Sequence, residues 1–183
     1  MEKVIELKRK DGQKIKAKLI LLDDNYMDKI MELQEVIYLG LDDKQLYSPS
    51  TKEEFSEFIS EKGRIVGCVT EDNELVAMGV YCKLGYEESN YGYDIELHGE
   101  ELLKVGQIES TLVKAEYRGN RLQKKICEVL EAIGKANNTP IMCATASPYN
   151  DYSVNTFKNL GYKIAKDKIK YGGLRRYVLV KEL

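Results

Sequence analysis

A strand that leads through a tight turn into a long amphipathic helix restricts the fold of this chain more than any other feature. Residues 105–114 read as a strand, and residues 120–137 carry apolar side chains at helical spacing. The apolar positions are Leu122, Ile126, Val129, Leu130 and Ile133. They share one face of the helix, and that face has to be buried. The strand just before it predicts that the helix packs on a sheet.

The other elements predict one mixed α/β domain that spans residues 1–183. Hydrophobic periodicity indicates further strands at 14–22, 64–70, 74–84, 140–146, 163–171 and 174–181, and further helices at 23–39, 51–62 and 150–160. A length of 183 residues is typical of a single domain. Residues 1–13 are expected to form an N-terminal extension. Residues 85–104, polar and rich in tyrosine, are expected to form a functional loop.

Charge and composition exclude several classes of protein. The 28 basic and 30 acidic residues give a net charge of −2, which argues against a nucleic-acid partner. No apolar run is long enough to span a bilayer, and the charged N-terminus lacks a signal sequence, so we expect a cytoplasmic protein with no membrane partner. The cysteines Cys68, Cys82, Cys127 and Cys143 form no C-x-x-C pair, and His98 is the only histidine. We therefore expect no metal site.

The turn before the long helix has features that are typical of a phosphate-binding site. The first N–H groups of a helix have no partner within the helix, and the helix dipole favours negative charge at that end. Arg118, Arg121, Lys124 and Lys125 add positive charge to the same place. This arrangement predicts a cradle for phosphate or pyrophosphate. The alternative is an ordinary turn with a solvated basic cluster.

In two motifs the sequence resembles the GCN5-related N-acetyltransferase (GNAT) superfamily. The phosphate-binding motif of that family, Q/R-x-x-G-x-G/A, falls on Arg118-Gly119-Asn120-Arg121-Leu122-Gln123, after a strand that ends at Leu112-Val113. A second motif has an Asn that opens a short helix, then a small residue, an aromatic residue and a Gly-aromatic pair. It falls on Asn150, Ser153, Phe157 and Gly161-Tyr162. The resemblance extends over about residues 15–183 through the order of elements.

The resemblance implies a fold and an acetyl-CoA site, with acetyl-CoA as co-substrate. The fold would be a central mixed, mostly antiparallel sheet with about four helices, its strands splayed at the cofactor. The backbone of Thr111, Leu112 and Val113 would pair with the pantetheine arm. Pyrophosphate would be held around Arg118, Gly119, Asn120, Arg121, Leu122, Gln123 and Lys124. Asn150 and Phe157 would complete the cofactor site, and the acetyl group would pass directly to a primary amine of a small molecule or peptide.

Two departures from the family pattern affect these expectations. Arg121 and Gln123 stand where the phosphate motif usually has small residues. Phe157 stands where the family often has a tyrosine that donates a proton to the leaving sulfur, and phenylalanine has no proton to donate. Tyr149, Tyr152 or water are the substitutes that we consider. The alternative function is a non-catalytic acyl-CoA-binding or sensing module of the same fold.

Glu109 is the first candidate for the general base. Side chains two apart in a strand share a face, so we expect Glu109, Thr111 and Val113 to point the same way, along the acetyl-CoA edge. An acidic residue on a central strand requires a reason. The alternative reason is an ion-paired or edge-exposed glutamate.

The acidic, tyrosine-rich stretch 85–104 is the expected acceptor side. Tyr93, Glu96, Glu100 and Glu101 combine negative charge with an aromatic ring, which suits an ammonium group. The three glutamates are also alternative bases. A solvated loop or a contact between two copies would explain the same composition, and we expect a monomer or a homodimer.

Overall fold

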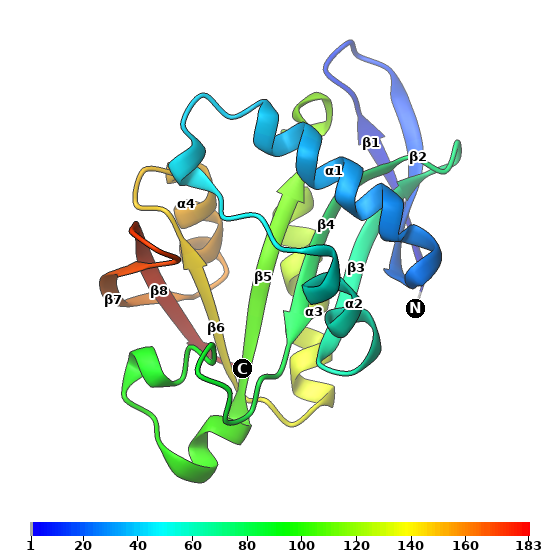
Figure 1. Cartoon of the computed structure of the whole chain (residues 1–183). Helices are drawn as coiled ribbons and strands as arrows, with labels where there is room; N and C mark the ends of the chain where they lie inside the picture. The colour runs from blue at the N-terminus through cyan, green and yellow to red at the C-terminus, as the bar shows by residue number, and fades with distance from the viewer. Residues whose placement is uncertain (1) are drawn as a thin grey trace.

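The computed structural model describes residues 2–183, in which eight strands form one sheet and four α-helices cover it (Figure 1). The strands are β1 (Glu2–Lys8), β2 (Lys14–Leu22), β3 (Gly63–Thr70), β4 (Leu75–Cys82), β5 (Val105–Val113), β6 (Ile141–Ala146), β7 (Lys163–Lys170) and β8 (Leu174–Glu182). The helices are α1 (Met27–Leu39), α2 (Lys52–Ser60), α3 (Leu122–Ala136) and α4 (Asp151–Asn159). None of the helices in this range combines the length and the apolarity that a bilayer crossing requires.

The sheet is mixed and mostly antiparallel, as expected. Its strand order is β1-β2-β3-β4-β5-β6-β8-β7. Only β5 and β6 run parallel, and the long connection between them contains α3. Strands β7 and β8 form a hairpin that turns at Gly172-Gly173. In the sheet, the last strand, β8, lies between β6 and β7.

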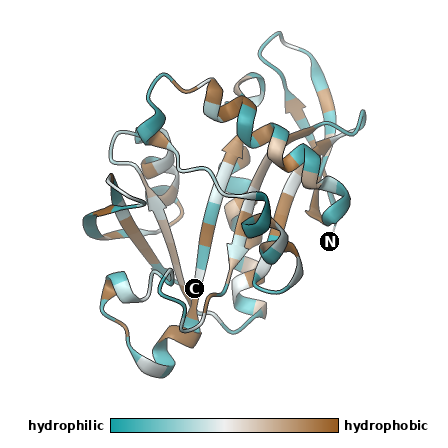
Figure 2. Ribbon diagram, viewed as in Figure 1, coloured by the Kyte–Doolittle hydropathy of each residue, from teal (hydrophilic) through white to brown (hydrophobic). Residues whose placement is uncertain are grey.

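The helices form a layer on each side of the sheet (Figure 1). On one side α1 and α2 bury Ile30, Leu33 and Phe55 against strand residues such as Met78. On the other side α3 and α4 share a second apolar cluster that includes Leu122, Ile126, Leu130, Val154 and Phe157. Figure 2 shows hydrophobic residues along the central strands and alternating hydrophobic and hydrophilic residues along the helices. The predicted amphipathic helix is thus confirmed, and its apolar face packs on the sheet.

The N-terminal residues correct one expectation. Within this stretch, residues 2–8 are not an extension of the domain, because they form β1 and pair antiparallel with β2 over their whole length. The burial pattern explains the error. Only Leu7 of β1 is fully buried, so this edge strand shows little hydrophobic alternation in its sequence. Met1 lies outside the described residues.

The two parallel strands separate halfway along their length. Pairing between β5 and β6 joins Val105–Ile108 to Ile141–Ala144 and stops there. The rest of β5 remains paired with β4 but not with β6. The expected splay between strands is therefore present, and it opens the sheet at Glu109 and Thr145.

Candidate functional site

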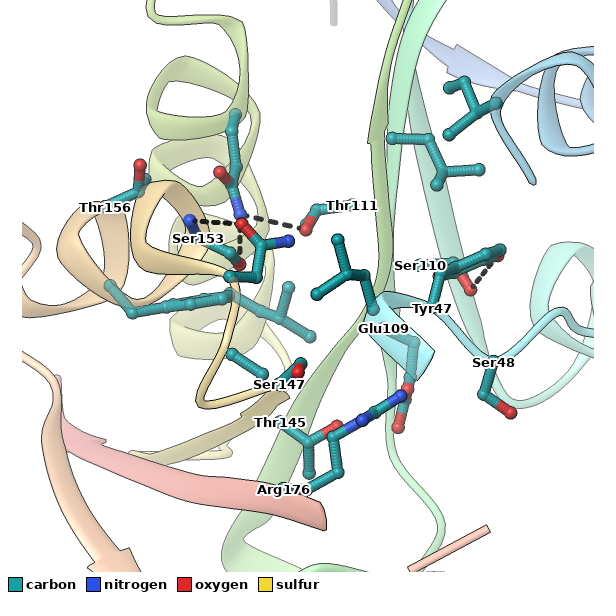
Figure 3. Close-up of a pocket in the computed structure, with 18 of the residues that line it drawn as sticks. Tyr47, Ser48, Glu109, Ser110, Thr111, Thr145, Ser147, Ser153, Thr156 and Arg176 are labelled. Carbon is teal, nitrogen blue, oxygen red and sulfur yellow. Dashed lines mark hydrogen bonds between the residues drawn. The ribbon is translucent and has the colours of Figure 1, made fainter. Parts of the chain in front are cut away.

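A cavity of about 1870 Å³ lies at the point where β5 and β6 diverge (Figure 3). It is continuous with both faces of the sheet. Its walls come from residues 108–113 of β5, the turn before α3, residues 145–147 of β6, the start of α4, the loop after α1 and the end of β7. Strands and segments far apart in sequence therefore meet at one site.

The turn before α3 has the backbone conformation expected of a phosphate cradle. Gly119 has φ +94°, and Arg121, the N-cap of α3, has φ +57°. This left-handed pair of residues turns the chain sharply, so that the N–H groups of the turn and of the first helical residues converge. Arg118, Gly119, Arg121, Leu122, Gln123 and Lys124 all line the cavity. The large residues Arg121 and Gln123 are accommodated without closing this end of the cavity.

Asn120 does not line the cavity, in contrast to the prediction from the motif. Its Nδ2 donates to the carbonyl oxygens of Lys8 and Tyr117, both at 2.8 Å, and its Oδ1 accepts from Lys8 N at 2.8 Å. The side chain therefore ties the turn to the end of β1. The role of this side chain is to hold the turn in place, since both N–H groups of its carboxamide and its oxygen are bonded within the chain.

Side chains on three elements are joined at the α3 end of the cavity. Gln123 Nε2 donates to Thr111 Oγ1 at 3.1 Å and to Ser153 Oγ at 3.0 Å. Asn150 caps α4, because its Oδ1 accepts from Ser153 N at 3.1 Å. Gln123 thus links β5, α3 and α4 across the gap between the strands (Figure 3). A small residue at this position could not make that link.

A β-bulge at Ser110 changes which side chains share a face. Val80 pairs with Glu109 and Met78 with Leu112, so Gly79 opposes two residues of β5. Ser110 has φ +46°, which is uncommon for a residue with a side chain.

The expectation that Glu109, Thr111 and Val113 point the same way is wrong. Thr111 contacts Gln123 of α3, and Val113 packs on the same side. Glu109 lies on the other face with its partner Val80, whose cluster includes α1 and α2. The bulge therefore leaves Thr111 and Val113 on the α3 side and turns Glu109 toward the opposite opening of the cavity.

Glu109 is held as a partly buried carboxylate whose pKa is raised to about 7. Burial is the main cause, because it removes water from the charged form. Hydrogen bonds from Tyr91 and Gln107, and the positive charge of Lys170, partly oppose this shift. Gln107 Nε2 donates to Glu109 Oε1 at 3.1 Å. A carboxyl group with a pKa near 7 is suited to accept and release a proton at neutral pH.

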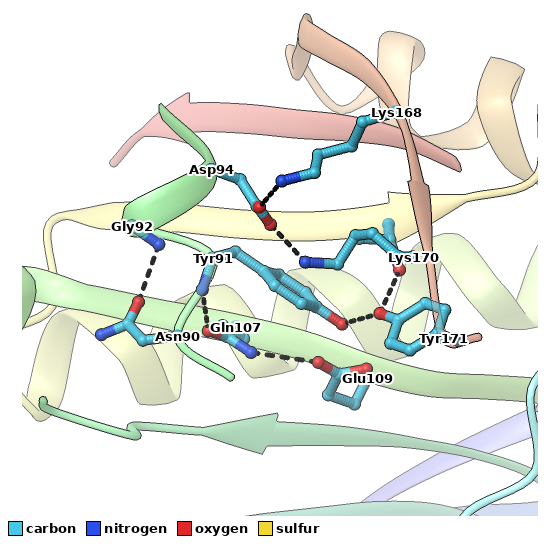
Figure 4. Close-up of polar contacts among 10 residues, drawn as sticks. Asn90, Tyr91, Gly92, Asp94, Gln107, Glu109, Lys168, Lys170 and Tyr171 are labelled. Carbon is cyan, nitrogen blue, oxygen red and sulfur yellow. Dashed lines mark hydrogen bonds and ion pairs between the residues drawn. The ribbon is translucent and has the colours of Figure 1, made fainter. Parts of the chain in front are cut away.

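A group of hydroxyls and charges surrounds this carboxylate (Figure 4). The Tyr91 hydroxyl is hydrogen bonded to the Tyr171 hydroxyl, which lies 3.0 Å from Thr145 Oγ1. Burial raises the pKa of both phenols, so they remain protonated donors. Lys170 pairs with Asp94 and lies 4.7 Å from the centre of the Tyr91 ring. These contacts connect β5, β7 and the 85–104 loop around one carboxylate.

The aromatic residues of α4 and the chain before it differ in exposure. Phe157 is buried against Tyr162, with ring centroids 5.2 Å apart, and lines the cavity. Tyr149 and Tyr152 also line the cavity, but they are 60% and 89% exposed. Ser147, which is buried, lies closer in sequence to the diverging strands. The role of proton donor stays a prediction for Tyr149 and Tyr152, and Ser147 joins them as a hydroxyl at the cavity wall.

Substitution of Phe157 by tyrosine is expected to leave turnover unchanged or to raise it. The new hydroxyl would stand at the position for which the resemblance implies a tyrosine donor, and a donor for the leaving thiolate assists the reaction. Turnover at saturating acetyl-CoA measures the effect, and calorimetry with CoA shows whether the site itself is intact. A fall in turnover with unchanged CoA affinity would contradict the expectation.

The 85–104 loop contributes to the cavity through residues other than the expected ones. Glu96 pairs with Lys166 at 2.6 Å, and the Tyr93 hydroxyl donates to the Tyr86 carbonyl at 3.1 Å. Glu100 and Glu101 are exposed. None of Tyr93, Glu96, Glu100 and Glu101 lines the cavity; Glu87, Glu88, Ser89, Tyr91 and Asp94 do. The composition of the loop indicated an acidic aromatic surface, but not which of its side chains turn inward.

Three further residues of the site carried no signal in the sequence. Tyr47, in the loop after α1, donates to Gln34 Oε1 at 2.7 Å and lies 3.3 Å from Ser110 Oγ. Tyr171, in the turn after β7, and Arg176 of β8 also line the cavity. The turn residues Gly172 and Gly173 could have indicated that β7 and β8 form a hairpin, but not that the hairpin faces Glu109.

Comparisons with known proteins agree with this geometry. An N-acetyltransferase from Staphylococcus aureus Mu50 has a TM-score of 0.68 at 14% identity, over 91% of this chain and 98% of the other. A Salmonella typhimurium protein described as an acetyltransferase, solved with its cofactor acetyl-CoA, has a TM-score of 0.68 at 11% identity, over 91% and 93%. The ribosomal-protein-S18-alanine N-acetyltransferase from Escherichia coli has a TM-score of 0.64 at 10% identity, over 90% and 91%.

At these identities the structural neighbours establish the fold alone. The search of curated proteins returns no match. The sequence itself, however, matches the model of the acetyltransferase (GNAT) family over residues 27–162, which is most of the chain and includes the phosphate turn and the start of α4. The chain therefore belongs to the acetyltransferase (GNAT) family.

Proposed function

We propose that the protein is an acetyl-CoA-dependent N-acetyltransferase that moves an acetyl group directly to a primary amine. One observation carries the proposal. A single cavity joins the turn at the start of α3 to a carboxylate with a pKa of about 7, across the gap between β5 and β6. The first of these features suits a pyrophosphate and the second suits an ammonium group.

The cofactor would lie along the diverging strands. Because β6 leaves β5 after Ile108, the backbone of Thr111, Leu112 and Val113 is free on that edge to pair with a pantetheine arm. The N–H groups from Gly119 to Lys124 would hold the pyrophosphate. Asn150 and Phe157, at the start and middle of α4, would border the thioester end of the arm.

Glu109 would act as the general base. It takes a proton from the ammonium group of the acceptor, directly or through a water molecule. The freed nitrogen forms a bond to the carbonyl carbon of the acetyl group, while the carbon–sulfur bond breaks and its electron pair leaves on the thiolate. The nitrogen of the new amide gives up its second proton, and the thiolate takes up that proton through water or through a hydroxyl such as that of Tyr149. Free N–H groups on β5 would stabilise the negative charge that develops on the carbonyl oxygen.

The acceptor would enter from the side that is lined by acidic groups. Asp42, Asp43, Glu87 and Glu88 line the cavity, and of these Glu87 is paired with Lys62. Negative charge at a pocket entrance attracts a cationic amine and raises its local concentration. We further propose that the reaction takes place in the cytoplasm, since all four cysteines are free and buried, which is typical of a reducing compartment.

The first test of the proposal is stabilisation by CoA. At a concentration one hundred times its dissociation constant, CoA is expected to stabilise the fold by about 2.7 kcal/mol, because a ligand that binds only the folded state shifts the unfolding equilibrium. A thermal melt with and without CoA measures the effect. No shift at millimolar CoA would contradict the cofactor assignment.

A non-catalytic acyl-CoA-binding module is the second candidate, and Phe157 favours it because no tyrosine hydroxyl stands at that position. Release of free thiol from acetyl-CoA in the presence of a panel of amines distinguishes the two. Amine-dependent release supports the enzyme. Binding of CoA without release by any amine supports the binding module.

A further inference from the structure

Arg176 of β8 is a buried cation whose hydrogen-bonding capacity is largely unused. The residue is 3% exposed and lines the cavity. Its Nη1 donates to the carbonyl oxygen of Arg175 at 2.9 Å. Its Nη2 is buried and has no partner in the structure of residues 2–183, and no ion pair of that range includes this guanidinium. Burial of a guanidinium without a partner costs free energy of folding, and a ligand that pairs with the guanidinium would offset this cost.

The neighbours of Arg176 do not supply a counter-charge. The guanidinium carbon lies 5.8 Å from the centre of the Tyr171 ring, a favourable but neutral contact. Two acidic residues lie on this side: Asp94 is already paired with Lys168 and Lys170, and Glu109 accepts a hydrogen bond from Gln107 and forms no ion pair with Arg176 in residues 2–183. An anionic group that entered the cavity would therefore meet a guanidinium that has no ion-pair partner in residues 2–183.

Arg176 faces the same side of the sheet as Glu109. Tyr177 packs with the cluster on the α3 and α4 side, and the adjacent Val178 packs with Tyr91 on the other side. By strand alternation Arg176 shares the face of Val178, which is the face of Tyr91, Gln107 and Glu109. Figure 3 shows Arg176 extending from β8 toward the part of the cavity where Glu109 lies.

Arg176 and Glu109 therefore place a cation and a carboxyl group on the same side of the cavity. The acidic entrance favours an acceptor with a positive amine, and the buried guanidinium favours a negative group on the same molecule. A molecule that carries both charges satisfies both conditions. A planar carboxylate fits the donor fork of a guanidinium best.

We propose that the acceptor is a small amine that also carries a carboxylate, of the amino acid type, and that Arg176 binds this carboxylate while Glu109 receives the proton of the ammonium group. The inference rests on the proposed acetyltransferase function. A free amino acid is favoured over a peptide because the guanidinium is buried, so that only an end of the acceptor can reach it.

The experiment compares acceptors that differ only in the carboxylate. Each of the common α-amino acids is assayed with saturating acetyl-CoA beside its decarboxylated amine and its carboxamide. For the best amino acid, kcat/KM is expected to exceed that of the decarboxylated amine by about ten- to hundredfold, as one or two charge-assisted hydrogen bonds would give. Equal or better use of the decarboxylated amine, the carboxamide or an internal peptide amine would overturn the inference.

Arg176→Met separates this role from a structural one. It should raise KM for the amino acid by about the same factor and leave the KM of acetyl-CoA and the use of the decarboxylated amine nearly unchanged, while Arg176→Lys restores part of the loss. Removal of an unpaired buried cation should not lower the melting temperature. Arg64→Met is the matched control, because Arg64 is also on a strand and also bonds a neighbouring carbonyl, but lies outside the cavity. An equal loss with both kinds of acceptor would overturn the proposal.

The outcomes also separate this inference from the proposed function. Turnover of simple amines without a carboxylate preference leaves the acetyltransferase standing and overturns the role of Arg176. If no acceptor is turned over, calorimetry of the same amino acids with the CoA-saturated protein decides. Binding that Arg176→Met abolishes supports the carboxylate site even when the transferase activity has failed, and absence of any such binding overturns it.

Discussion

Substitution of Glu109 by glutamine is expected to lower the turnover of amine acetylation by about 10²–10⁴-fold, the usual contribution of a general base. Glutamine keeps the size of the side chain and can still bond Gln107, but it does not accept a proton at neutral pH. CoA affinity should stay the same, because the phosphate turn lies at the other end of the cavity. Turnover at saturating amine and calorimetry with CoA measure the two effects.

The pH dependence identifies the group. Because the pKa of Glu109 is raised to about 7, the rate should rise as the pH increases through about 7 and level off above it, and this limb should be absent in Glu109→Gln. Glu35→Gln, an exposed change on α1 outside the cavity, serves as control. Full turnover of Glu109→Gln would show that the base lies elsewhere.

The same shift predicts an effect on stability, and its sign follows from proton binding. In the unfolded chain the carboxyl has its ordinary pKa of 4.5, so between about pH 4.5 and 7 the folded state binds more protons than the unfolded state. The free energy of unfolding should therefore fall as the pH rises through this range. The fall should be smaller in Glu109→Gln, as urea titrations at several pH values would show.

Local periodicity was sufficient to predict most of the elements but not the edge strand β1. The helix over Leu122–Ala136 and the strands β3, β4, β5, β6 and β8 have apolar patterns that match their burial, whereas β7 is exposed along most of its length. Residues 2–8 lack such a pattern, because an edge strand buries few side chains and gains its place from pairing with β2. That pairing depends on a partner and cannot be inferred from the strand alone.

The candidate site was only partly predictable, for a related reason. The phosphate turn is a continuous stretch, so its residues could be found in the sequence. The direction of Glu109 depends on a bulge opposite Gly79, a property of two strands together. Tyr171 and Arg176 enter the site because β8 inserts between β6 and β7, a placement that strand propensity does not contain. The bonds of the Asn120 side chain to Lys8 could not be predicted, because Lys8 is 112 residues away in the chain.

A substitution of Gly119 tests most directly whether the turn before α3 binds the cofactor. Its φ of +94° is a backbone conformation that a β-branched residue does not adopt without strain. Apart from the two chain neighbours of Gly119, no atom of residues 2–183 lies within 4 Å of the Cβ that a substitution would add, so the strain comes from the backbone and not from a clash. Such strain costs about 1–3 kcal/mol, which the chain relieves by changing the turn. The N–H groups of the turn would then no longer converge.

Substitution of Gly119 by valine is therefore expected to raise the dissociation constant of CoA by about tenfold or more, since each 1.4 kcal/mol of lost binding energy corresponds to a factor of ten. Gly12→Val is the matched control. Gly12 has φ +90°, also with no atom near its added Cβ, but it lies in the turn between β1 and β2, outside the cavity. Both variants should lose stability, and only Gly119→Val should lose CoA affinity, as calorimetry on the folded proteins would measure. Equal CoA affinity in the two variants would mean that the turn before α3 does not hold the pyrophosphate, whatever its likeness to a phosphate cradle.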